Sequence, residues 1–214
     1  MVLLKHRIYL GLYAKIFPAL AYYLTRELRG CRTVLDLGCG ENSPLRWVKK
    51  SFRSVGVETF QPAIEISQAL GIHDDYVNSD VLAADFPERS FDAVLALDLI
   101  EHLPHTDGLV LLERMERFAA RKVIVFTPNG FLPQDTFNHN PFQEHKSGWT
   151  VADFRSRGYR VLGINGLKPL RGRGTQPVIR PRLLGRVISD ITRPLAHRCP
   201  ELAFQLLCIK DITA

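Results

Sequence analysis

The sequence predicts an α/β fold in which a mainly parallel sheet has helices on both faces. Short apolar runs alternate with segments of helical periodicity along most of the chain. The run 92–97 shows no polar alternation after Asp92, which is typical of a central strand buried on both sides. The chain has 214 residues, 46% hydrophobic and 23% charged. This excludes wholesale disorder, collagen and a coiled coil, and it leaves ample length for a core.

Strands are expected where short apolar runs rich in β-branched residues are bounded by polar or turn residues. These runs cover residues 33–37, 54–58, 75–78, 92–97, 122–127, 159–164 and 202–209.

Helices are expected mainly between these strands. They cover residues 12–28, 44–50, 62–70, 107–118 and 150–157. Ser43 is the expected N-cap of the second helix, with Pro44 at its first position. Gly71 ends the third helix, and Thr106 or Asp107 caps the fourth.

The chain is interpreted as a single domain, 1–214. Its parts are an N-terminal helix (1–30), a core (31–165), a basic insertion rich in Gly, Pro and Arg (166–200) and a last strand (201–214). The four cysteines form no C-x-x-C pair, which argues against a zinc ribbon or a disulfide scaffold. A reducing, cytoplasmic location is therefore predicted.

Charge is distributed unevenly along the chain. The net charge is +6, but residues 155–198 contain eleven Lys and Arg against one acid, Asp190, so that segment carries +10 and the rest −4. This favours contact with a phosphorylated substrate, a lipid headgroup or nucleic acid, the alternative being a solvated basic face. The N-terminus superficially resembles a signal peptide, but Lys15 interrupts its apolar run. Peripheral membrane contact by its aromatic residues is an alternative to core packing.

A glycine turn is the sharpest local signal. Gly38-Cys39-Gly40 lies between a predicted strand and a predicted helix, where backbone N–H groups can approach a ligand. A dinucleotide fingerprint would have a third glycine at Ser43. Glu58, twenty residues after Gly38, has the spacing of an acid that reaches a ribose. These residues predict a nucleoside site.

Five motifs in order resemble class I S-adenosylmethionine-dependent methyltransferases, most closely the small-molecule and ubiquinone-type group. They are VLDLGCG (34–40), VGVE (55–58), NSDV (78–81), the segment 86–103 and VIVFTPN (123–129). The resemblance covers about residues 30–165. It implies a Rossmann-like fold with an antiparallel last strand, and S-adenosylmethionine as cofactor.

The same resemblance implies which residues bind the cofactor. Those at its methionine end are Asp36, Gly38, Cys39 and Gly40, with Leu97 and Asp98 closing over the amine. Those at its nucleoside end are Glu58 on the ribose hydroxyls, and Asp80, Val81 and Phe60 around the adenine.

Methyl transfer from a sulfonium is an in-line displacement, so positioning supplies most of the acceleration. A general base is required only when the acceptor must lose a proton. The candidates are Glu101, His102, His105, His139 and His145, and among them Glu101, His102 and His145 are the predicted catalytic residues.

The segment from Asp98 to His102, followed by His145 before Trp149-Thr150, also resembles small-RNA 3′-terminal 2′-O-methyltransferases. That resemblance makes Asp98, Glu101, His102 and His145 candidate ligands for Mg²⁺, Mn²⁺ or Zn²⁺. The sequence departs from that pattern because Asp98 stands where those enzymes have Glu. In the alternative interpretation, Glu101 and His102 cap a loop and His145 hydrogen-bonds locally.

The expected function is O-methylation of a small, lipid-linked or glycan-linked acceptor, with an anionic acceptor favoured by the basic insertion. The alternatives are a metal-dependent RNA ribose 2′-O-methyltransferase and a non-catalytic S-adenosylmethionine-binding protein. Nucleic acid is disfavoured as a partner because no RNA-binding module is present. His73 and His197 are interpreted as surface residues, and Trp47 and Trp149 as packing residues.

Overall fold

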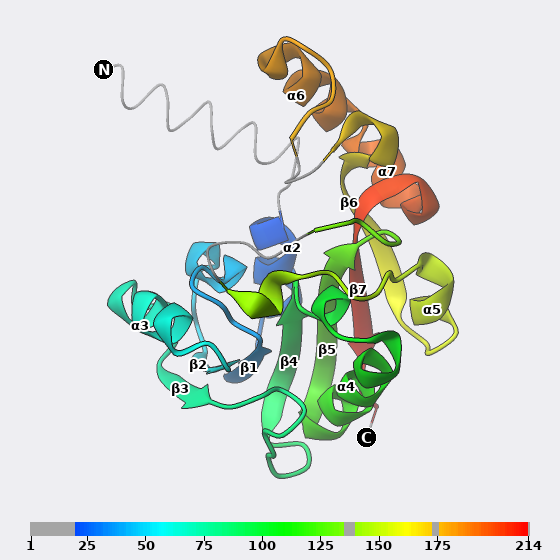
Figure 1. Ribbon diagram of the computed structural model, residues 1–214. Helices are drawn as coiled ribbons and strands as arrows, with labels where there is room; N and C mark the ends of the chain where they lie inside the picture. Colours follow the sequence, from blue (N-terminus) through cyan, green and yellow to red (C-terminus); the bar gives the residue numbers. More distant parts are fainter. Residues whose placement is uncertain (1–19, 135–139, 173–175, 214) are drawn as a thin grey trace.

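The computed structural model describes residues 20–134, 140–172 and 176–213. These residues form a seven-stranded sheet in the order β3-β2-β1-β4-β5-β7-β6 (Figure 1). The strands are β1 (Thr33–Leu37), β2 (Arg53–Glu58), β3 (Asp75–Asn78), β4 (Phe91–Leu97), β5 (Ala119–Pro128), β6 (Arg160–Leu167) and β7 (Ala203–Asp211). β1 to β5 pair in parallel, whereas β7 is antiparallel to both of its neighbours. The predicted fold class, including the antiparallel last strand, is confirmed.

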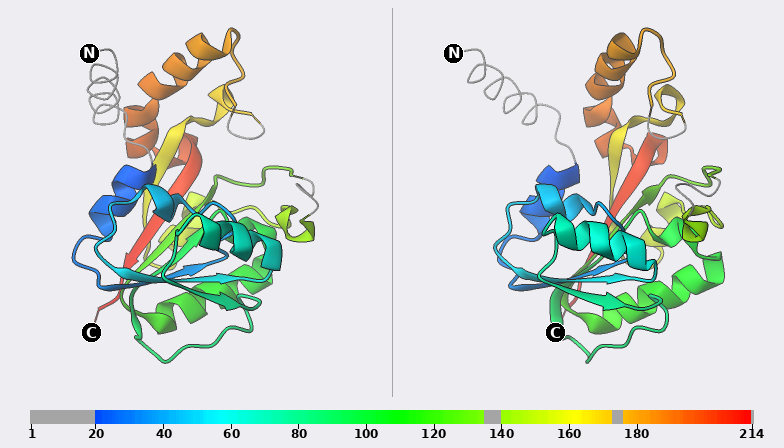
Figure 2. Two further views of the ribbon diagram at one scale, coloured as in Figure 1. Left: turned by 90° about the vertical axis from the view of Figure 1, so that its left-hand side faces the viewer. Right: turned by 60° about the vertical axis from the view of Figure 1, so that its left-hand side comes forward.

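Helices lie on both sides of this sheet (Figures 1 and 2). They are α2 (Leu20–Glu27), α3 (Gln61–Ala69), α4 (His105–Phe118), α5 (Val151–Arg155), α6 (Arg182–Ile191) and α7 (Arg193–Arg198). The predicted helix over 44–50 is wrong, because only a 3-10 turn forms at Pro44–Trp47. Val48 then adopts extended backbone and is buried. α4 begins directly after Pro104, so neither Thr106 nor Asp107 is its N-cap.

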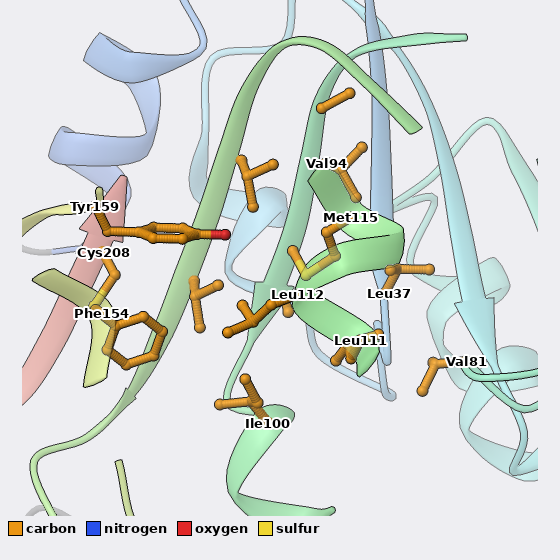
Figure 3. Close-up of a cluster of buried hydrophobic side chains, with 14 of the residues drawn as sticks. Leu37, Val81, Val94, Ile100, Leu111, Leu112, Met115, Phe154, Tyr159 and Cys208 are labelled. Carbon is orange, nitrogen blue, oxygen red and sulfur yellow. The ribbon is translucent and has the colours of Figure 1, made fainter. Parts of the chain in front are cut away.

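Two apolar clusters cover the two faces of the sheet. Successive residues of β4 alternate between them: Val94 packs in the cluster under α4, and Leu95 in the cluster on the side of α2. Figure 3 shows the first cluster, in which Leu112 and Met115 of α4 pack over the strands beside Phe154. This alternation is the reason why the run 92–97 is apolar throughout.

The basic insertion leaves the sheet at the end of β6. Because β5 and β6 are both antiparallel to β7, β6 runs in the same direction as β5. The insertion therefore starts at the edge where the parallel strands have their carboxyl ends, and α6 projects beyond that edge (Figure 1). Close backbone packing holds it there, since a Cβ on Gly163 would lie 2.0 Å from the Ala196 carbonyl oxygen.

An ion-pair cluster also holds the insertion. Arg171 and Arg193 lie 3.3 Å and 2.7 Å from the same buried carboxylate oxygen of Asp190. Arg171 is thus a structural residue and not part of an exposed basic face. Within the described ranges, no helix has the length and apolarity needed to cross a bilayer.

Candidate functional site

A cleft of about 500 Å³ opens at the carboxyl ends of β1, β2 and β4. Open α/β sheets bind ligands at this edge. Most of the residues predicted to bind the cofactor line it: Gly38, Cys39, Gly40, Glu58, Asp80, Val81, Leu97 and Asp98.

The glycine turn forms one wall of the cleft. Gly38 and Gly40 have φ angles of 64° and 56°, in the left-handed region that favours glycine. A Cβ on Gly38 would lie 2.5 Å from a methyl carbon of Leu99, so a side chain there would displace Leu99. Cys39 is buried, and burial raises the pKa of its thiol far above the usual range, which fits a packing role and not a nucleophile.

Glu58 stands at the end of β2 with both oxygens hydrogen-bonded to backbone. One oxygen accepts from the Gly40 N–H at 3.0 Å. The other accepts from the N–H groups of Thr59 and Phe60, each at 2.9 Å. A carboxylate has about four acceptor positions, so one remains for a ligand. Glu58 thus fixes the glycine turn and faces the cleft at the same time.

Asp36 does not line the cleft, contrary to the prediction. Its carboxylate is buried beneath the glycine turn, where it accepts from the Ser43 hydroxyl at 2.6 Å and lies 3.0 Å from His73 Nε2. The prediction that His73 is a surface residue is wrong for the same reason. Phe60 is also absent from the cleft lining and contributes its backbone N–H to Glu58.

Removing the His73 side chain should destabilise the fold. In His73→Ala the buried Asp36 carboxylate would keep only the Ser43 hydroxyl, and an unsatisfied buried partner costs about 1–3 kcal/mol. We expect the urea-unfolding free energy to fall by that amount. Gln68→Ala, at an exposed residue of α3, is the control and should stay within about 0.5 kcal/mol of the parent. Equal values for the two variants would contradict a stabilising Asp36–His73 contact.

The end of β4 has an unusual backbone. Asp98 has a φ of 52°, a left-handed conformation that Asp tolerates better than most residues. Its N–H donates to the Phe126 carbonyl at 2.8 Å, and its carboxylate accepts from Gln205 at 3.3 Å. This turn directs the chain from Leu97 into the short 3-10 segment Ile100–His102.

A second cavity of about 250 Å³ adjoins the cleft and shares Asp98, His102 and Gln143 with it. Glu101 and His145 also line this cavity. One potential ligand atom from each of Glu101, His102 and His145 lies within 4.8 Å of the others. The three predicted catalytic residues therefore lie close to one another, and Asp98 faces the same cavity. Their position beside a cofactor methyl group stays a prediction.

The two histidines of this cluster have the same hydrogen-bonding pattern. His102 Nδ1 lies 3.1 Å from the Glu144 carbonyl oxygen, and His145 Nδ1 lies 2.6 Å from that of Leu132. A carbonyl only accepts, so we assign the proton to Nδ1, which leaves Nε2 as the basic nitrogen. Burial lowers the pKa of His145, and it lowers that of His102 to about 4, so both rings are neutral at neutral pH.

Glu101 connects the two segments that form the cavity. Its buried carboxylate accepts from the Thr127 hydroxyl at 3.0 Å. Its backbone carbonyl accepts from the N–H groups of Lys146 and Ser147, which brings His145 over the cavity. Burial, with neighbouring Asp98, raises the pKa of Glu101 well above its usual range. Asp98 lines the cleft, but the surrounding protein still removes water from its carboxylate, and this desolvation raises the pKa of Asp98.

The remaining candidates lie elsewhere. His105 stacks on Trp149 with ring centroids 4.3 Å apart and lines neither cavity, and His139 lies outside the described residues. Trp149 is fully buried, as expected for a packing residue, but Trp47 is 69% exposed, which contradicts that interpretation for it. His197 is half-buried against Tyr23 and is not a free surface residue.

Several lining residues were not anticipated from the sequence. They are Asn140, Phe142, Gln143 and Lys146 in the loop before α5, and Gln205 in β7. Gln205 carried a usable signal, because it is a polar residue within the apolar run of the last strand. The loop residues show no periodicity that would place them at a site.

Comparison with known proteins agrees with this geometry. Residues 35–130 match the family model described as "Methyltransferase domain". A sterol 24-C-methyltransferase from Yarrowia lipolytica is 34% identical over 84 residues, covering 36% of this chain and 22% of the relative. A cycloartenol-C-24-methyltransferase from Arabidopsis thaliana is 35% identical over 83 residues, covering 35% and 25%. The matched region thus spans about a quarter or less of these relatives.

Solved structures show the same fold at low sequence identity. A SAM-dependent methyltransferase from Archaeoglobus fulgidus aligns with a TM-score of 0.55 at 20% identity, covering 95% of this chain and 99% of the other. The methyltransferase domain of bacterial CtHen1-C aligns with a TM-score of 0.58 at 17% identity, covering 91% and 97%. These similarities confirm the predicted fold over nearly the whole chain.

Proposed function

We propose that this chain, whose residues 35–130 match a methyltransferase domain, is a class I S-adenosylmethionine-dependent methyltransferase that methylates an acceptor hydroxyl. His102 is the proposed general base. The observation that supports this most directly is its position, because His102 lines both the large cleft and the adjoining polar cavity.

The large cleft is the proposed cofactor site. Its observed features fit an adenosyl ligand: a glycine turn without side chains, a Glu58 carboxylate with remaining acceptor capacity, and Asp80 beside Val81 on the opposite wall. Bound S-adenosylmethionine would supply an electrophilic methyl group on a positively charged sulfur. Asp98 and Leu97, at the end of β4, would lie at the methionine end.

The adjoining cavity is the proposed acceptor site. An acceptor hydroxyl bound there would form the new C–O bond as the C–S bond breaks, with the electron pair of that bond leaving on sulfur. The hydroxyl proton would pass to His102 Nε2, since Nδ1 is occupied by the Glu144 carbonyl. His145, held in the same way, would orient the hydroxyl.

A hydroxyl suits this cavity better than an apolar carbon acceptor. Its walls contain Asp98, Glu101, two histidines and Gln205, and leaving these groups unpaired against a hydrocarbon would be costly. The C-24 methylation named for the sterol relatives concerns a carbon atom. Because their alignment covers little more than a third of this chain, it leaves the acceptor of this protein open. We propose a small, lipid-linked or glycan-linked acceptor, with peripheral membrane contact.

A metal-assisted reaction is the second candidate, favoured by the convergence of Glu101, His102 and His145. The residues fit a divalent cation: a backbone carbonyl orients each histidine through Nδ1 and leaves Nε2 to face the cation, as the hydrogen-bond partners of metal-bound histidines do. A bound cation would lower the pKa of an acceptor hydroxyl. In this form the acceptor could be an RNA 3′-terminal ribose.

The proposal is tested by methyl transfer from ¹³C-methyl-labelled S-adenosylmethionine to panels of lipid-linked phenols, glycans, sterols and short RNAs. Product NMR separates O-methyl from C-methyl carbons by chemical shift. We expect O-methyl product from a hydroxylated small or lipid-linked acceptor. Exclusive C-methylation would overturn the proposal. Methylation of RNA alone, lost with a chelator, would favour the second candidate.

Acid should inactivate the enzyme only well below pH 6.5. A general base works while it is unprotonated, and burial lowers the pKa of His102 to about 4. The inflection near 6.5 that an unperturbed histidine would give is therefore not expected. The measurement is kcat/KM against pH at constant ionic strength, with unfolding monitored in parallel. Because burial also raises the pKa of Asp98, the profile is measured for Asp98→Asn as well, and an inflection at pH 6.5 that persists in that variant with the fold intact would contradict this assignment.

A further inference from the structure

α6 and α7 together present an apolar stripe to solvent. Its three members in α6 lie three or four residues apart, so they follow one face of that helix, and its fourth member lies in α7. They are Leu184 (50% exposed), Val187 (45%), Ile191 (62%) and Leu195 (50%). Exposed apolar side chains that form a continuous row on one element indicate an interaction surface.

α6 packs on the protein through small and polar residues, the reverse of an ordinary surface helix. Ser189 is fully buried and Asp190 nearly so, the latter between Arg171 and Arg193. Gly185 packs against the Ile179 carbonyl, where a Cβ would lie only 2.4 Å away. These contacts fix the rotation of the helix, so the apolar stripe cannot turn inward without breaking them.

The charge around the stripe is positive. Arg180, Arg182, Arg186 and Arg198 are all exposed. Asp190 is the only acid between residues 155 and 198, and it is buried and paired. With 3.6 residues per turn, Arg182 and Arg186 lie on the other side of α6 from Leu184, Val187 and Ile191. A helix with an apolar face and an arginine-bearing polar face matches a bilayer surface with anionic headgroups, where the apolar face enters the acyl boundary and the cations are attracted to phosphates.

We infer that the stripe of α6 and α7 docks on an anionic lipid surface. The insertion leaves the sheet at the edge that also carries the cleft, so docking would hold the cleft opening near the bilayer. This inference rests on the proposed function in one respect, which is that the acceptor is lipid-linked. It identifies the surface through which the protein would make peripheral contact with the membrane.

Three other occupants of the stripe are conceivable: residues 1–19, a second copy of the chain and a nucleic acid. The charges and side chains of the stripe disfavour each of them. Residues 1–19 contain Lys5, Arg7 and Lys15 and no acid, so they would be repelled by a basic surface. A second copy would bring two strongly basic segments together. The stripe has Leu, Val and Ile but no aromatic ring on which nucleic-acid bases could stack.

The test is co-sedimentation of the full chain with phosphatidylcholine vesicles, with and without phosphatidylglycerol, in the absence of cofactor and acceptor. We expect binding to the phosphatidylglycerol vesicles that weakens with salt, and little binding to pure phosphatidylcholine. Leu184→Ser/Val187→Ser/Ile191→Ser should lower the partition coefficient at least tenfold. Arg182→Glu/Arg186→Glu should remove the preference for anionic vesicles.

Matched controls change similar residues elsewhere. Ile66→Ser/Leu70→Ser/Val110→Ser alters apolar residues of similar exposure at α3 and α4, and Arg29→Glu/Lys49→Glu alters two exposed cations. Both should bind vesicles like the parent chain. Circular dichroism and S-adenosylmethionine affinity verify that every variant is folded.

Failure of the parent chain to bind anionic vesicles would overturn the inference, as would equal binding by the stripe variant and its control. A dimer that the stripe variant dissociates, with vesicle binding unchanged, would assign the stripe to a second copy. Faster trypsin cleavage at Lys5, Arg7 or Lys15 in that variant, again with unchanged vesicle binding, would assign it to residues 1–19. A parent chain that does not bind vesicles but still O-methylates a soluble acceptor would refute only the docking surface. A parent chain that binds vesicles but methylates no acceptor would refute only the proposed function.

Discussion

His102→Ala should lower kcat by about 10²–10⁴-fold, the contribution typical of a positioned general base. Its affinity for S-adenosylmethionine should stay within about twofold of the parent chain. The reason is that His102 lies where the cleft meets the adjoining cavity, whereas the glycine turn and Glu58 are positioned by other contacts. Steady-state kinetics and calorimetry measure the two quantities independently.

His105→Ala is the matched control for that variant. His105 is three residues away, is exposed, and stacks on Trp149 outside both cavities. It should retain nearly full activity. Activity of His102→Ala within about threefold of the parent would refute the base assignment.

Chelation separates the two ways in which His102 could act. If it is the base without a metal, a chelator should leave the activity of the parent chain unchanged. If it is a metal ligand, chelation should remove activity, and His102→Ala should lose bound metal as measured by elemental analysis. His145→Ala should then lose the same metal, since one ligand atom from each residue lies within 4.8 Å of the others.

The sequence was informative where local chemistry determines structure. The run 92–97 identified the central strand because both faces of β4 are covered. Gly38 and Gly40 identified the turn because their backbone conformation favours glycine. The convergence of Glu101, His102 and His145 was expected from their motif, and the hydrogen bonds of the Glu101 carbonyl to Lys146 and Ser147 explain it.

Errors arose where tertiary contacts determine the role of a residue. Asp36 lies within the motif VLDLGCG (34–40), but its carboxylate contacts His73 beneath the glycine turn, and this partner is 37 residues away in the sequence. No local pattern in the sequence pairs these two residues. The helix expected after Pro44 stops early because Val48 packs in the core, which outweighs helix propensity.

The orientation of α6 could not be derived from charge counting either. The sequence indicated a basic insertion, but Arg171 and Arg193 are used internally to hold Asp190. The packing of Gly185 and Ser189, together with the ion pairs of Asp190, determines that Leu184, Val187 and Ile191 face outward. The docking surface that we infer for the insertion is therefore the apolar stripe of α6 and α7, which the total charge of the segment does not reveal.

Glu58→Ala should weaken S-adenosylmethionine binding at least tenfold. Two effects combine in this variant: a ribose hydroxyl would lose an ionised acceptor, and the Gly40 N–H would lose the bond that holds the glycine turn. Hydrogen bonds to a charged group contribute about 1.5–3 kcal/mol each, and every 1.4 kcal/mol corresponds to a factor of ten. Calorimetry measures the affinity, and urea unfolding measures the accompanying loss of stability.

Asp74→Ala is a control for the structural part of this effect. Asp74 is also a carboxylate that holds backbone, accepting from the Ser54 N–H at 2.7 Å and from Lys50 at 2.9 Å, but it does not line the cleft. Its loss should lower stability and leave cofactor affinity unchanged. An equal fall in affinity for Asp74→Ala and Glu58→Ala would mean that global destabilisation explains both.

The ribose contact itself is isolated by comparing S-adenosylhomocysteine with its 2′-deoxy analogue. If the Glu58 carboxylate accepts from that hydroxyl, removing the hydroxyl should weaken binding to the parent chain by about tenfold or more, since the bond involves a charged acceptor. In Glu58→Ala the acceptor is already absent, so the two ligands should bind almost equally. The difference in affinity between the two ligands is unaffected by loosening of the glycine turn, because the turn is equally loose for both ligands. The same discrimination between the ligands in both proteins would place the ribose away from Glu58.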